Sequence, residues 1–257
     1  MTISEIKQGL ATKLIAQNIQ IYPQIDSTNK EAIRQAYNSV AEGTLILAET
    51  QTDGKGKRGR NWIAPARSSI LGSIILYPKI DSRQRGIITL LTAVAIARSI
   101  RTMTGLPAMI KWPNDVMIYG KKVCGILTET GPMDSLIVGF GVNVNIGQEN
   151  MPQAIRTTAS SIQIALGHNF SRTKLLQDLL INFEELYLLL NAGKQNEILT
   201  EIRTLSSTIG QYVSIKQGDR IITGNAWMID DDGGLLIRNK YGRLDKIYSG
   251  EITKEKN

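Results

Sequence analysis

The residues most capable of chemistry gather in one glycine-rich, basic segment of the chain, residues 51–62. Its glycines would let the backbone approach a ligand closely, and its cations would attract an anion. The glycines are Gly54, Gly56 and Gly59, and the cations are Lys55, Lys57, Arg58 and Arg60. Such a loop is suited to hold phosphates or carboxylates, so the sequence predicts an anion-binding site here.

Two familiar nucleotide-binding motifs are imitated by this segment. The glycines spell G-x-G-x-x-G, but Gly59 is followed by Trp62, Pro65 and a strand, with no helix to hold a pyrophosphate. The spacing of Gly54 and Gly59 is that of a Walker A loop, but Arg60-Asn61 replaces the required Lys-Ser/Thr pair. A solvated basic loop or a nucleic-acid patch is the alternative. The loop connects two apolar strands, however, which favours a site.

The elements that must position this loop alternate between helical and strand patterns. Helical spacing covers about residues 3–17, and the capping-box pattern Thr28-Asn29-Lys30-Glu31 predicts a helix that starts near Thr28. The other predicted elements before the middle of the chain are strands at 19–22, 44–49 and 69–77 and a helix at about 83–103. The basic loop therefore lies between the second and third strands.

The second half of the chain continues with strands and a long helix, and after them the pattern changes to short strands separated by turns. Strands are predicted at 108–112, 116–119, 123–130 and 135–145, with a tight turn at Gly120-Lys121 that presents Lys122. Ser171 is the expected N-cap of a long helix through Leu190. After Gly210 short strands alternate with glycine turns, as in a small β-barrel. We expect two domains, residues 1–206 and 207–257.

Composition excludes several classes of protein. The chain has 257 residues, of which 42% are hydrophobic and 21% charged, as in a globular protein with a core. One cysteine and one histidine exclude a disulfide framework and a clustered zinc site. The apolar stretch 87–100 contains Thr89, Thr92 and Arg98, which predicts a buried helix and not a membrane span. The N-terminus lacks a signal-peptide pattern, so we expect a cytoplasmic protein with no membrane partner.

Several ordered motifs give the chain a resemblance to a known family. They are Asp26-Ser27-Thr28-Asn29, the basic loop, Lys111-Trp112-Pro113-Asn114-Asp115, the segment Lys122 to Glu129 (KVCGILTE), Gly139-Phe140-Gly141-Val142-Asn143, and Ser249-Gly250-Glu251-Ile252. In type and order they resemble the motifs of biotin–protein ligases. The resemblance covers almost the whole chain, in a short form without an N-terminal DNA-binding domain.

The resemblance implies an α/β (α+β) fold: a class II aminoacyl-tRNA synthetase-like catalytic domain with a mixed sheet and helices, and a C-terminal SH3-like β-barrel. It also implies a two-step reaction with ATP and biotin as substrates and Mg²⁺ as the accompanying ion. Biotin is first activated as biotinyl-5'-AMP and then passed to a lysine of a biotin carboxyl carrier protein, the natural one being that of acetyl-CoA carboxylase. Homodimerisation through the sheet stays open.

The matching motif positions imply a role for each site residue. The residues implied to contact biotin are Ser27, Thr28, Asn29, Gln51, Lys55, Gly56, Lys57, Lys122 and Gly125. Those implied for ATP are Arg58, Arg60, Trp62, Lys111, Asn114 and Asn143, and the catalytic set is Lys122, Lys57, Arg60 and Lys111. Asp115 is the candidate Mg²⁺ ligand, although it could instead brace a turn.

The chemistry explains why cations are needed. Adenylation joins a carboxylate to an anionic nucleotide, so fixed cations must offset the repulsion, and we assign Lys122 to the acyl and α-phosphate junction. The family usually has Arg where this chain has Lys55 and Lys57, and Lys cannot make the planar bidentate contact of Arg. Cys124 is expected to be buried and inert, and His168 to have no catalytic role.

Three other functions are compatible with parts of the sequence. A lipoate–protein ligase would share the scaffold and the adenylate chemistry. A DNA-binding regulator would need a helix-turn-helix, but only about 25 residues precede Asp26, too few for such a domain with its own core. We therefore expect no sequence-specific nucleic-acid partner. A non-catalytic binding module would release no pyrophosphate with any acid.

Overall fold

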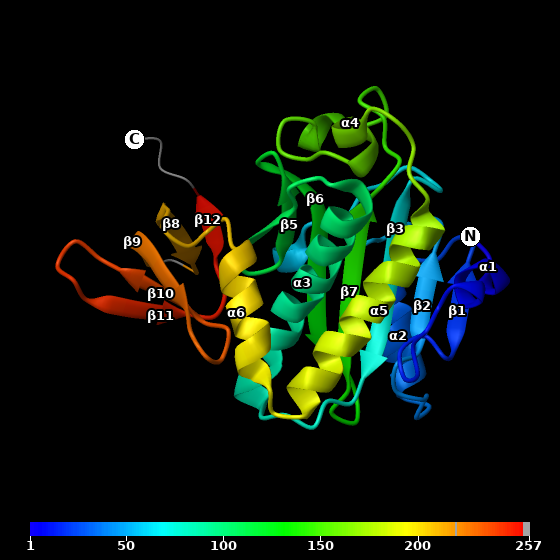
Figure 1. Cartoon of the computed structure of the whole chain (residues 1–257), viewed down its shortest axis with the longest axis horizontal. Helices are drawn as coiled ribbons and strands as arrows, with labels where there is room; N and C mark the ends of the chain where they lie inside the picture. Colours follow the sequence, from blue (N-terminus) through cyan, green and yellow to red (C-terminus); the bar gives the residue numbers. More distant parts are fainter. Residues whose placement is uncertain (219, 254–257) are drawn as a thin grey trace.

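The centre of the protein is a seven-stranded mixed sheet (Figure 1). The computed structural model describes residues 1–218 and 220–253. In spatial order the strands are β1 (Ile19–Tyr22), β2 (Leu45–Ala48), β3 (Ser69–Leu76), β7 (Leu136–Asn143), β6 (Lys121–Thr130), β5 (Asp115–Ile118) and β4 (Met109–Lys111). Only the pair β1–β2 is parallel among them, and the other neighbours are antiparallel. The strands predicted from residue 19 to residue 145 are confirmed.

Helices cover both faces of this sheet. The helices α3 (Arg85–Thr104), α5 (Arg172–Asn191) and α6 (Gln195–Leu205) pack on one face, and α2 (Thr28–Ala36) lies on the other (Figure 1). Successive residues of a strand point to opposite faces of the sheet and pack in different clusters. Ile74 belongs to the main core, whereas Ile75 packs with Ala32 of α2. Helix α3 is long and apolar enough to span a membrane, but 72% of that window is buried. The prediction of a buried core helix is confirmed.

In the N-terminal region one predicted helix is wrong and another is confirmed in its starting point only. The helical spacing of residues 3–17 produces only α1 (Ile3–Gln8), because the backbone N–H groups of Lys13, Leu14 and Ile15 donate instead to the carboxylate of Glu184, at 2.7 Å each. The carboxylate comes from α5, far along the chain, so no local pattern could reveal it. The helix predicted to start near Thr28 is confirmed as α2, but the capping box is absent. Ser27 is the N-cap of α2 and makes no side-chain cap.

Other local predictions are confirmed. Ser171 caps α5 by accepting from the N–H of Lys174. Tyr119 and Gly120 both have positive φ, 49° and 74°, as a tight turn between β5 and β6 requires. The sequence patterns did not predict α4 (Ile162–Leu166), α6, or the 3-10 turns η1 (Lys57–Gly59), η2 (Ser82–Gln84) and η3 (Gln153–Ile155).

The C-terminal part forms a second, antiparallel sheet of five strands, as predicted for a small β domain. Its strands, in spatial order, are β11 (Leu244–Ile247), β10 (Leu235–Arg238), β9 (Arg220–Ile229), β8 (Tyr212–Gln217) and β12 (Glu251–Thr253). Several inward residues of this sheet, Val213 and Leu235 among them, join the same hydrophobic cluster as the helices of the first part. The two sheets are therefore connected by apolar packing.

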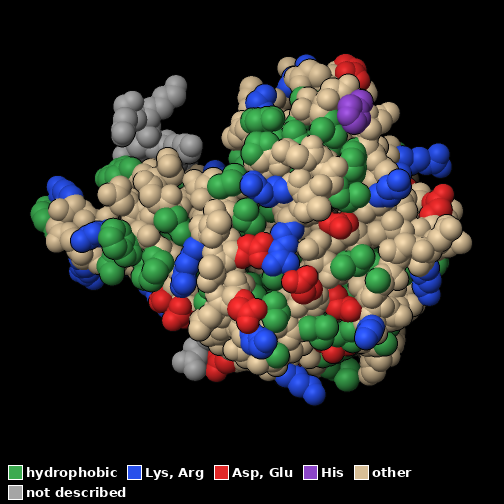
Figure 2. Space-filling view, in the orientation of Figure 1, with side chains coloured by type: hydrophobic (Ala, Val, Ile, Leu, Met, Phe, Trp, Pro, Cys, Tyr) green, Lys and Arg blue, Asp and Glu red, His purple; other side chains and the backbone are tan. Residues whose placement is uncertain are grey.

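The surface over α3, α5 and α6 carries mixed charges (Figure 2). Basic and acidic side chains lie intermingled there, and Arg98 of α3 is an example, since it pairs with Glu185 at 3.1 Å and also with Glu201. The net charge of +7 therefore forms no continuous basic surface on this face. The cations of the basic loop lie on the other side of the sheet.

Candidate active site

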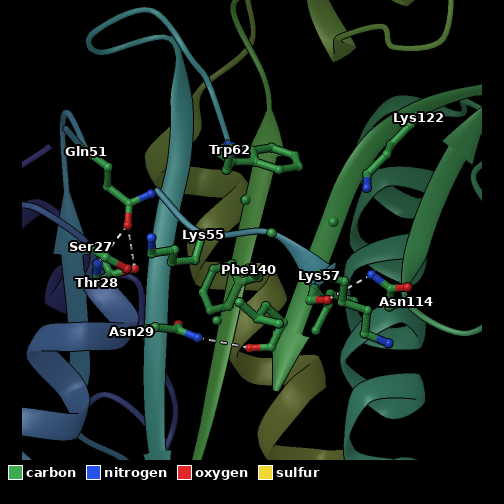
Figure 3. A pocket seen from close by; sticks show the side chains of 16 residues that line it. Ser27, Thr28, Asn29, Gln51, Lys55, Lys57, Trp62, Asn114, Lys122 and Phe140 are labelled. Atoms are coloured by element: carbon green, nitrogen blue, oxygen red, sulfur yellow. Dashed lines mark hydrogen bonds between the residues drawn. The ribbon is translucent and has the colours of Figure 1, made fainter. Parts of the chain in front are cut away.

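Two adjoining cavities occupy the face of the sheet opposite α3 and α5, and the basic loop lines both of them. Figure 3 shows the inner one. The inner cavity is bounded by the N-terminus of α2, the loop, and strands β6 and β7. The outer cavity extends from the loop to the C-terminal domain. Five residues line both cavities: Gly56, Lys57, Trp62, Asn114 and Lys122. A ligand in one cavity would therefore meet a ligand in the other at these side chains.

Every residue implied to bind biotin lines the inner cavity. These are Ser27, Thr28, Asn29, Gln51, Lys55, Gly56, Lys57, Lys122 and Gly125. Ser27, Thr28 and Asn29 are almost fully buried. Gln51 is held in one orientation, because its Oε1 accepts from the backbone N–H of Thr28 at 2.7 Å and lies 3.1 Å from the Thr28 hydroxyl. Its Nε2 is left to face a ligand as a donor.

Glycines make room for the large side chains of the site. A Cβ at Gly139 would lie 2.0 Å from Asn29 Oδ1, and one at Gly141 would lie 2.4 Å from the ring of Trp62. A Cβ at Gly125 would also meet the Trp62 ring, at 2.8 Å. These distances are too short for any real contact, so the G-x-G of β7 and the glycine of β6 are needed for Asn29 and Trp62 to lie flat against the sheet.

The basic loop is folded on itself, whereas like-charge repulsion alone would favour an extended loop. The N–H of Gly56 donates to Arg60 O at 2.7 Å, and the N–H of Trp62 donates to Gly54 O at 2.9 Å. Internal carboxylates offset part of the charge: Lys55 Nζ lies 2.9 Å from Asp53 Oδ1. Gly59 is not followed by a helix, which confirms that the dinucleotide-binding motif is only imitated.

Lys57 lies at the boundary of the two cavities in a partly buried position. Burial lowers the pKa of its ammonium, since desolvation disfavours the charged form. Asp115 opposes this shift, while Arg58 and Lys122 add to it by repulsion. A bound anion would relieve this unfavourable environment, so Lys57 is suited to receive one.

Lys122 is fixed at both its backbone and its side chain. Its N–H donates to Thr158 O at 2.9 Å, and its carbonyl accepts from Ser160 N–H at 2.8 Å. The ammonium lies 2.7 Å from Asp115 Oδ1 and 5.7 Å from the centre of the Trp62 ring. A cation held in advance where the cavities meet can stabilise negative charge that develops there.

The residues implied to bind ATP all line the outer cavity: Arg58, Arg60, Trp62, Lys111, Asn114 and Asn143. The two arginines pair with Glu251 of β12, Arg58 at 3.6 Å and Arg60 more closely. Lys111 Nζ lies 3.4 Å from Ile252 O. The Ser-Gly-Glu-Ile segment of the C-terminal domain thus contributes to this cavity.

Some lining residues carried no prediction. The outer cavity is also lined by Ile155, Thr157, Thr158, Ala159, Gly250, Glu251 and Ile252, and the inner one by Gly139, Phe140 and Gly141. The motif G-x-G-x-N and the Ser-Gly-Glu-Ile segment were signals for two of these groups. Residues 155–159 carry no motif, and they reach the site through the backbone bonds to Lys122.

Cys124 is fully buried beside the site, and burial raises the pKa of its thiol, as expected of an inert cysteine. Within residues 1–218 and 220–253, no three His, Cys, Asp or Glu side chains form a group that could hold a metal ion. Asp115 lines the outer cavity, and the buried Oδ1 of Asn143 has no hydrogen-bond partner among the described residues. These two side chains are the oxygen donors that an ion brought in by a ligand could use.

Comparison with known proteins agrees with this geometry. Residues 21–145 match the Biotin/lipoate A/B protein ligase family, and residues 208–254 match the Biotin protein ligase C terminal domain. The chain is 36% identical over 255 residues to the bifunctional ligase/repressor BirA of Bacillus spizizenii. The aligned residues cover 97% of this chain and 78% of that protein.

Two further relatives bear directly on the catalytic part. The biotin--[acetyl-CoA-carboxylase] ligase of Mycobacterium tuberculosis is 27% identical over 243 residues, which are 92% of this chain and 89% of that protein. The structure of biotin protein ligase from Aquifex aeolicus in complex with biotin and ATP superposes with a TM-score of 0.82, at 29% identity, and covers 92% of this chain and 98% of that one. This chain therefore belongs to the biotin protein ligase family.

Proposed function

We propose that this enzyme, a biotin–[acetyl-CoA-carboxylase] ligase, binds biotin in the inner cavity and ATP in the outer one. The observation that carries the proposal is that the two cavities meet at Lys57, Trp62 and Lys122. A carboxylate at the mouth of the inner cavity would lie next to a phosphate in the outer cavity, between two lysines. That arrangement is suited to adenylation, in which a carboxylic acid is joined to the α-phosphate of a nucleotide.

In the first step a carboxylate oxygen of biotin attacks the α-phosphorus of ATP. The bond from that phosphorus to the bridging oxygen breaks, and pyrophosphate leaves. Lys122 and Lys57 offset the repulsion between the two anions and the charge that develops, while Arg58 and Arg60 are placed to hold the outer phosphates. One preorganised donor of this kind contributes on the order of 3 kcal/mol, or roughly a hundredfold in rate.

Mg²⁺ accompanies ATP in this proposal, and it would supply further positive charge to the phosphates. Asp115 and Asn143 fit it, because their oxygens are hard donors that line the outer cavity. The triphosphate and water would supply the other ligands, since Mg²⁺ needs few from the protein.

In the second step the amine of the acceptor lysine attacks the acyl carbonyl of biotinyl-AMP. An amide bond forms, the amine loses a proton, and AMP leaves. The acceptor that we propose is the biotin carboxyl carrier protein of acetyl-CoA carboxylase, after the name of the Mycobacterium tuberculosis relative. We place the reaction in the cytoplasm, with a soluble enzyme and no sequence-specific nucleic-acid partner; a homodimer through the sheet is compatible with it.

The inner cavity favours biotin over lipoate as the acid. Its closed end presents hydroxyls and amides from Ser27, Thr28, Asn29 and Gln51, which suit a cyclic urea with two N–H groups and one carbonyl. The dithiolane ring of lipoate has no such groups and would leave these side chains without partners, at a cost of about 1–3 kcal/mol each.

The test is to incubate the enzyme with ATP and either acid and to measure pyrophosphate release and the acyl-adenylate by mass spectrometry. Biotin should give both products, and lipoate should give neither above background. Subsequent addition of a carrier domain should consume the adenylate and add one biotin to the carrier. Adenylate formed from lipoate and not from biotin would refute the proposal, as would no product from either acid.

A further inference from the structure

A hydrogen-bonded network lies behind the inner cavity and reaches a carboxylate that does not line it. Asn29, at the start of α2, extends over Gly139 of β7 to strand β6. There its Nδ2 donates to Glu129 Oε2 at 2.6 Å and to Leu127 O at 3.2 Å (the latter dashed in Figure 3). On the other side, Asn29 Oδ1 lies 2.6 Å from the hydroxyl of the fully buried Ser73.

Glu129 decides which way the Asn29 amide points. Both protons of Nδ2 are used by acceptors, one of them a carboxylate, so a flipped amide would place Oδ1 against two oxygens. A hydrogen bond to an ionised group is about twice as strong as a neutral one. Asn29 must therefore present its oxygen, and not its NH₂, to Ser73.

This orientation fixes the protons of the hydroxyls nearer the ligand. Ser73 Oγ lies 2.6 Å from Asn29 Oδ1 and 2.8 Å from Thr28 Oγ1, but one hydroxyl has a single proton. When Ser73 donates to Asn29, the Thr28 hydroxyl uses its own proton for Gln51 Oε1, to which it donates at 3.1 Å. Gln51 Oε1 also accepts from the backbone N–H of Thr28 at 2.7 Å, and Thr28 Oγ1 then accepts no proton from Ser73.

We propose that Glu129 is a positioning residue that, through Asn29 and Ser73, keeps the Thr28 hydroxyl oxygen free to accept a hydrogen bond from the ligand. The inference rests on the proposed function, in which a ureido N–H of biotin meets Thr28. Gln51 Nε2 then faces the ligand as a donor, suited to the ureido carbonyl. A flipped Asn29 would donate to Ser73, and the Ser73 proton would then go to Thr28 Oγ1 at 2.8 Å, where it would compete with the N–H of the ligand for that oxygen.

The test measures biotin binding by titration calorimetry in the wild type and in Glu129→Gln, with KM for ATP as a second readout. A neutral amide at this position can rotate, so it no longer selects one orientation of Asn29. We expect the Kd for biotin to rise about tenfold, which is 1.4 kcal/mol, with KM for ATP unchanged. Glu185→Gln is the matched control, because it removes a carboxylate from an exposed position on α5, and its Kd should stay within about twofold of the wild type.

A second variant separates positioning from a general effect on structure. Asn29→Asp places two carboxylates in contact and should raise the Kd about a hundredfold. In that background Glu129→Gln should tighten binding, since it removes the repulsion and can donate to the new carboxylate. The same substitution therefore has opposite signs in the two backgrounds.

The outcomes are distinct. Equal weakening by Glu129→Gln in both backgrounds, or no weakening in the wild type, would overturn the inference and leave the proposed function intact. A wild-type enzyme that binds no biotin would overturn both.

Discussion

At the scale of single residues, the site depends on two lysines that must stay protonated although they are partly buried. Lys122 has a carboxylate partner at 2.7 Å, whereas no ion pair is formed by Lys57 within the described part of the chain. Without a carboxylate paired to it, Lys57 keeps the pKa that burial lowers. This lowered pKa gives the enzyme a testable dependence on pH.

The lowered pKa of Lys57 predicts an early loss of activity in alkaline solution. A lysine with a lowered pKa releases its proton at a lower pH than free lysine, and the neutral form no longer offsets the negative charge of the substrates. We expect kcat/KM for biotin to fall on an alkaline limb at a pH below the ordinary pKa of a lysine, because this parameter reports the groups of the free enzyme.

Lys57→Arg should move that limb to higher pH, since a guanidinium stays charged throughout. The measurement is a pH profile of biotin-dependent pyrophosphate release for both proteins. Lys121→Arg, a change at the exposed neighbour of Lys122, is the control and should leave the limb in place. An identical limb in all three proteins would mean that Lys57 does not set it.

At the scale of elements, the basic loop is the segment whose environment a ligand should change most. Its arginines are accessible, with side chains 40% exposed at Arg58 and 65% exposed at Arg60, and they pair with Glu251 across the outer cavity. Phosphates of ATP would compete for the same cations. We propose that residues 53–60 are mobile without ligand and close over the substrates, which would also shelter the reactive adenylate from water.

Limited digestion with trypsin tests this closure. Cleavage after the loop cations should slow about tenfold or more when biotin and ATP are added together, because a protease cuts opened segments. Cleavage after Lys240, in the exposed turn between β10 and β11, gives an internal reference that should not change. Equal loop cleavage with and without substrates would contradict the proposal.

The elements also explain how far the sequence could be interpreted. Apolar strands and the helix that begins after Ser171 are local patterns, and they were predicted to within a few residues. The pattern at Thr28 predicted where α2 begins but not how it is capped, because the Thr28 hydroxyl contacts Gln51 and Ser73, which are distant in sequence. Local patterns cannot reveal a competing partner that only the folded sheet brings near.

The site was predictable to the extent that its residues lie in motifs. Strands β3, β7 and β6 are neighbours in the sheet, so motifs spread over the chain converge on one face. Ser73 and residues 155–159 could not be found in this way. Their roles come from register and backbone pairing, which a list of motifs does not contain.

At the scale of the whole molecule, the two sheets behave as one body around Trp112. Its Nε1–H donates to Gly233 O at 3.1 Å, and its backbone N–H donates to Thr208 Oγ1 at 3.0 Å. We propose a division into domains of residues 1–206 and 207–257, although one apolar cluster spans both. A shared core predicts that they unfold together.

Equilibrium unfolding in urea should therefore show a single transition by fluorescence and by circular dichroism. Trp112→Phe should lower the free energy of unfolding by about 2 kcal/mol, because it shrinks a buried side chain and leaves Gly233 O without a donor. Trp227→Phe is the control, since Trp227 is 51% exposed, and its effect should stay within about 0.5 kcal/mol. Two separate transitions would contradict the shared core.

In the proposed reaction, fixed cations at the junction of the two cavities let biotin and ATP react. This role of the cations is tested most directly by biotin-dependent exchange of labelled pyrophosphate into ATP, compared among the wild type, Lys122→Ala and the exposed-neighbour control Lys121→Ala. We predict exchange only with biotin, a loss of roughly a hundredfold in Lys122→Ala, and wild-type exchange in Lys121→Ala. Undiminished exchange in Lys122→Ala would contradict the account.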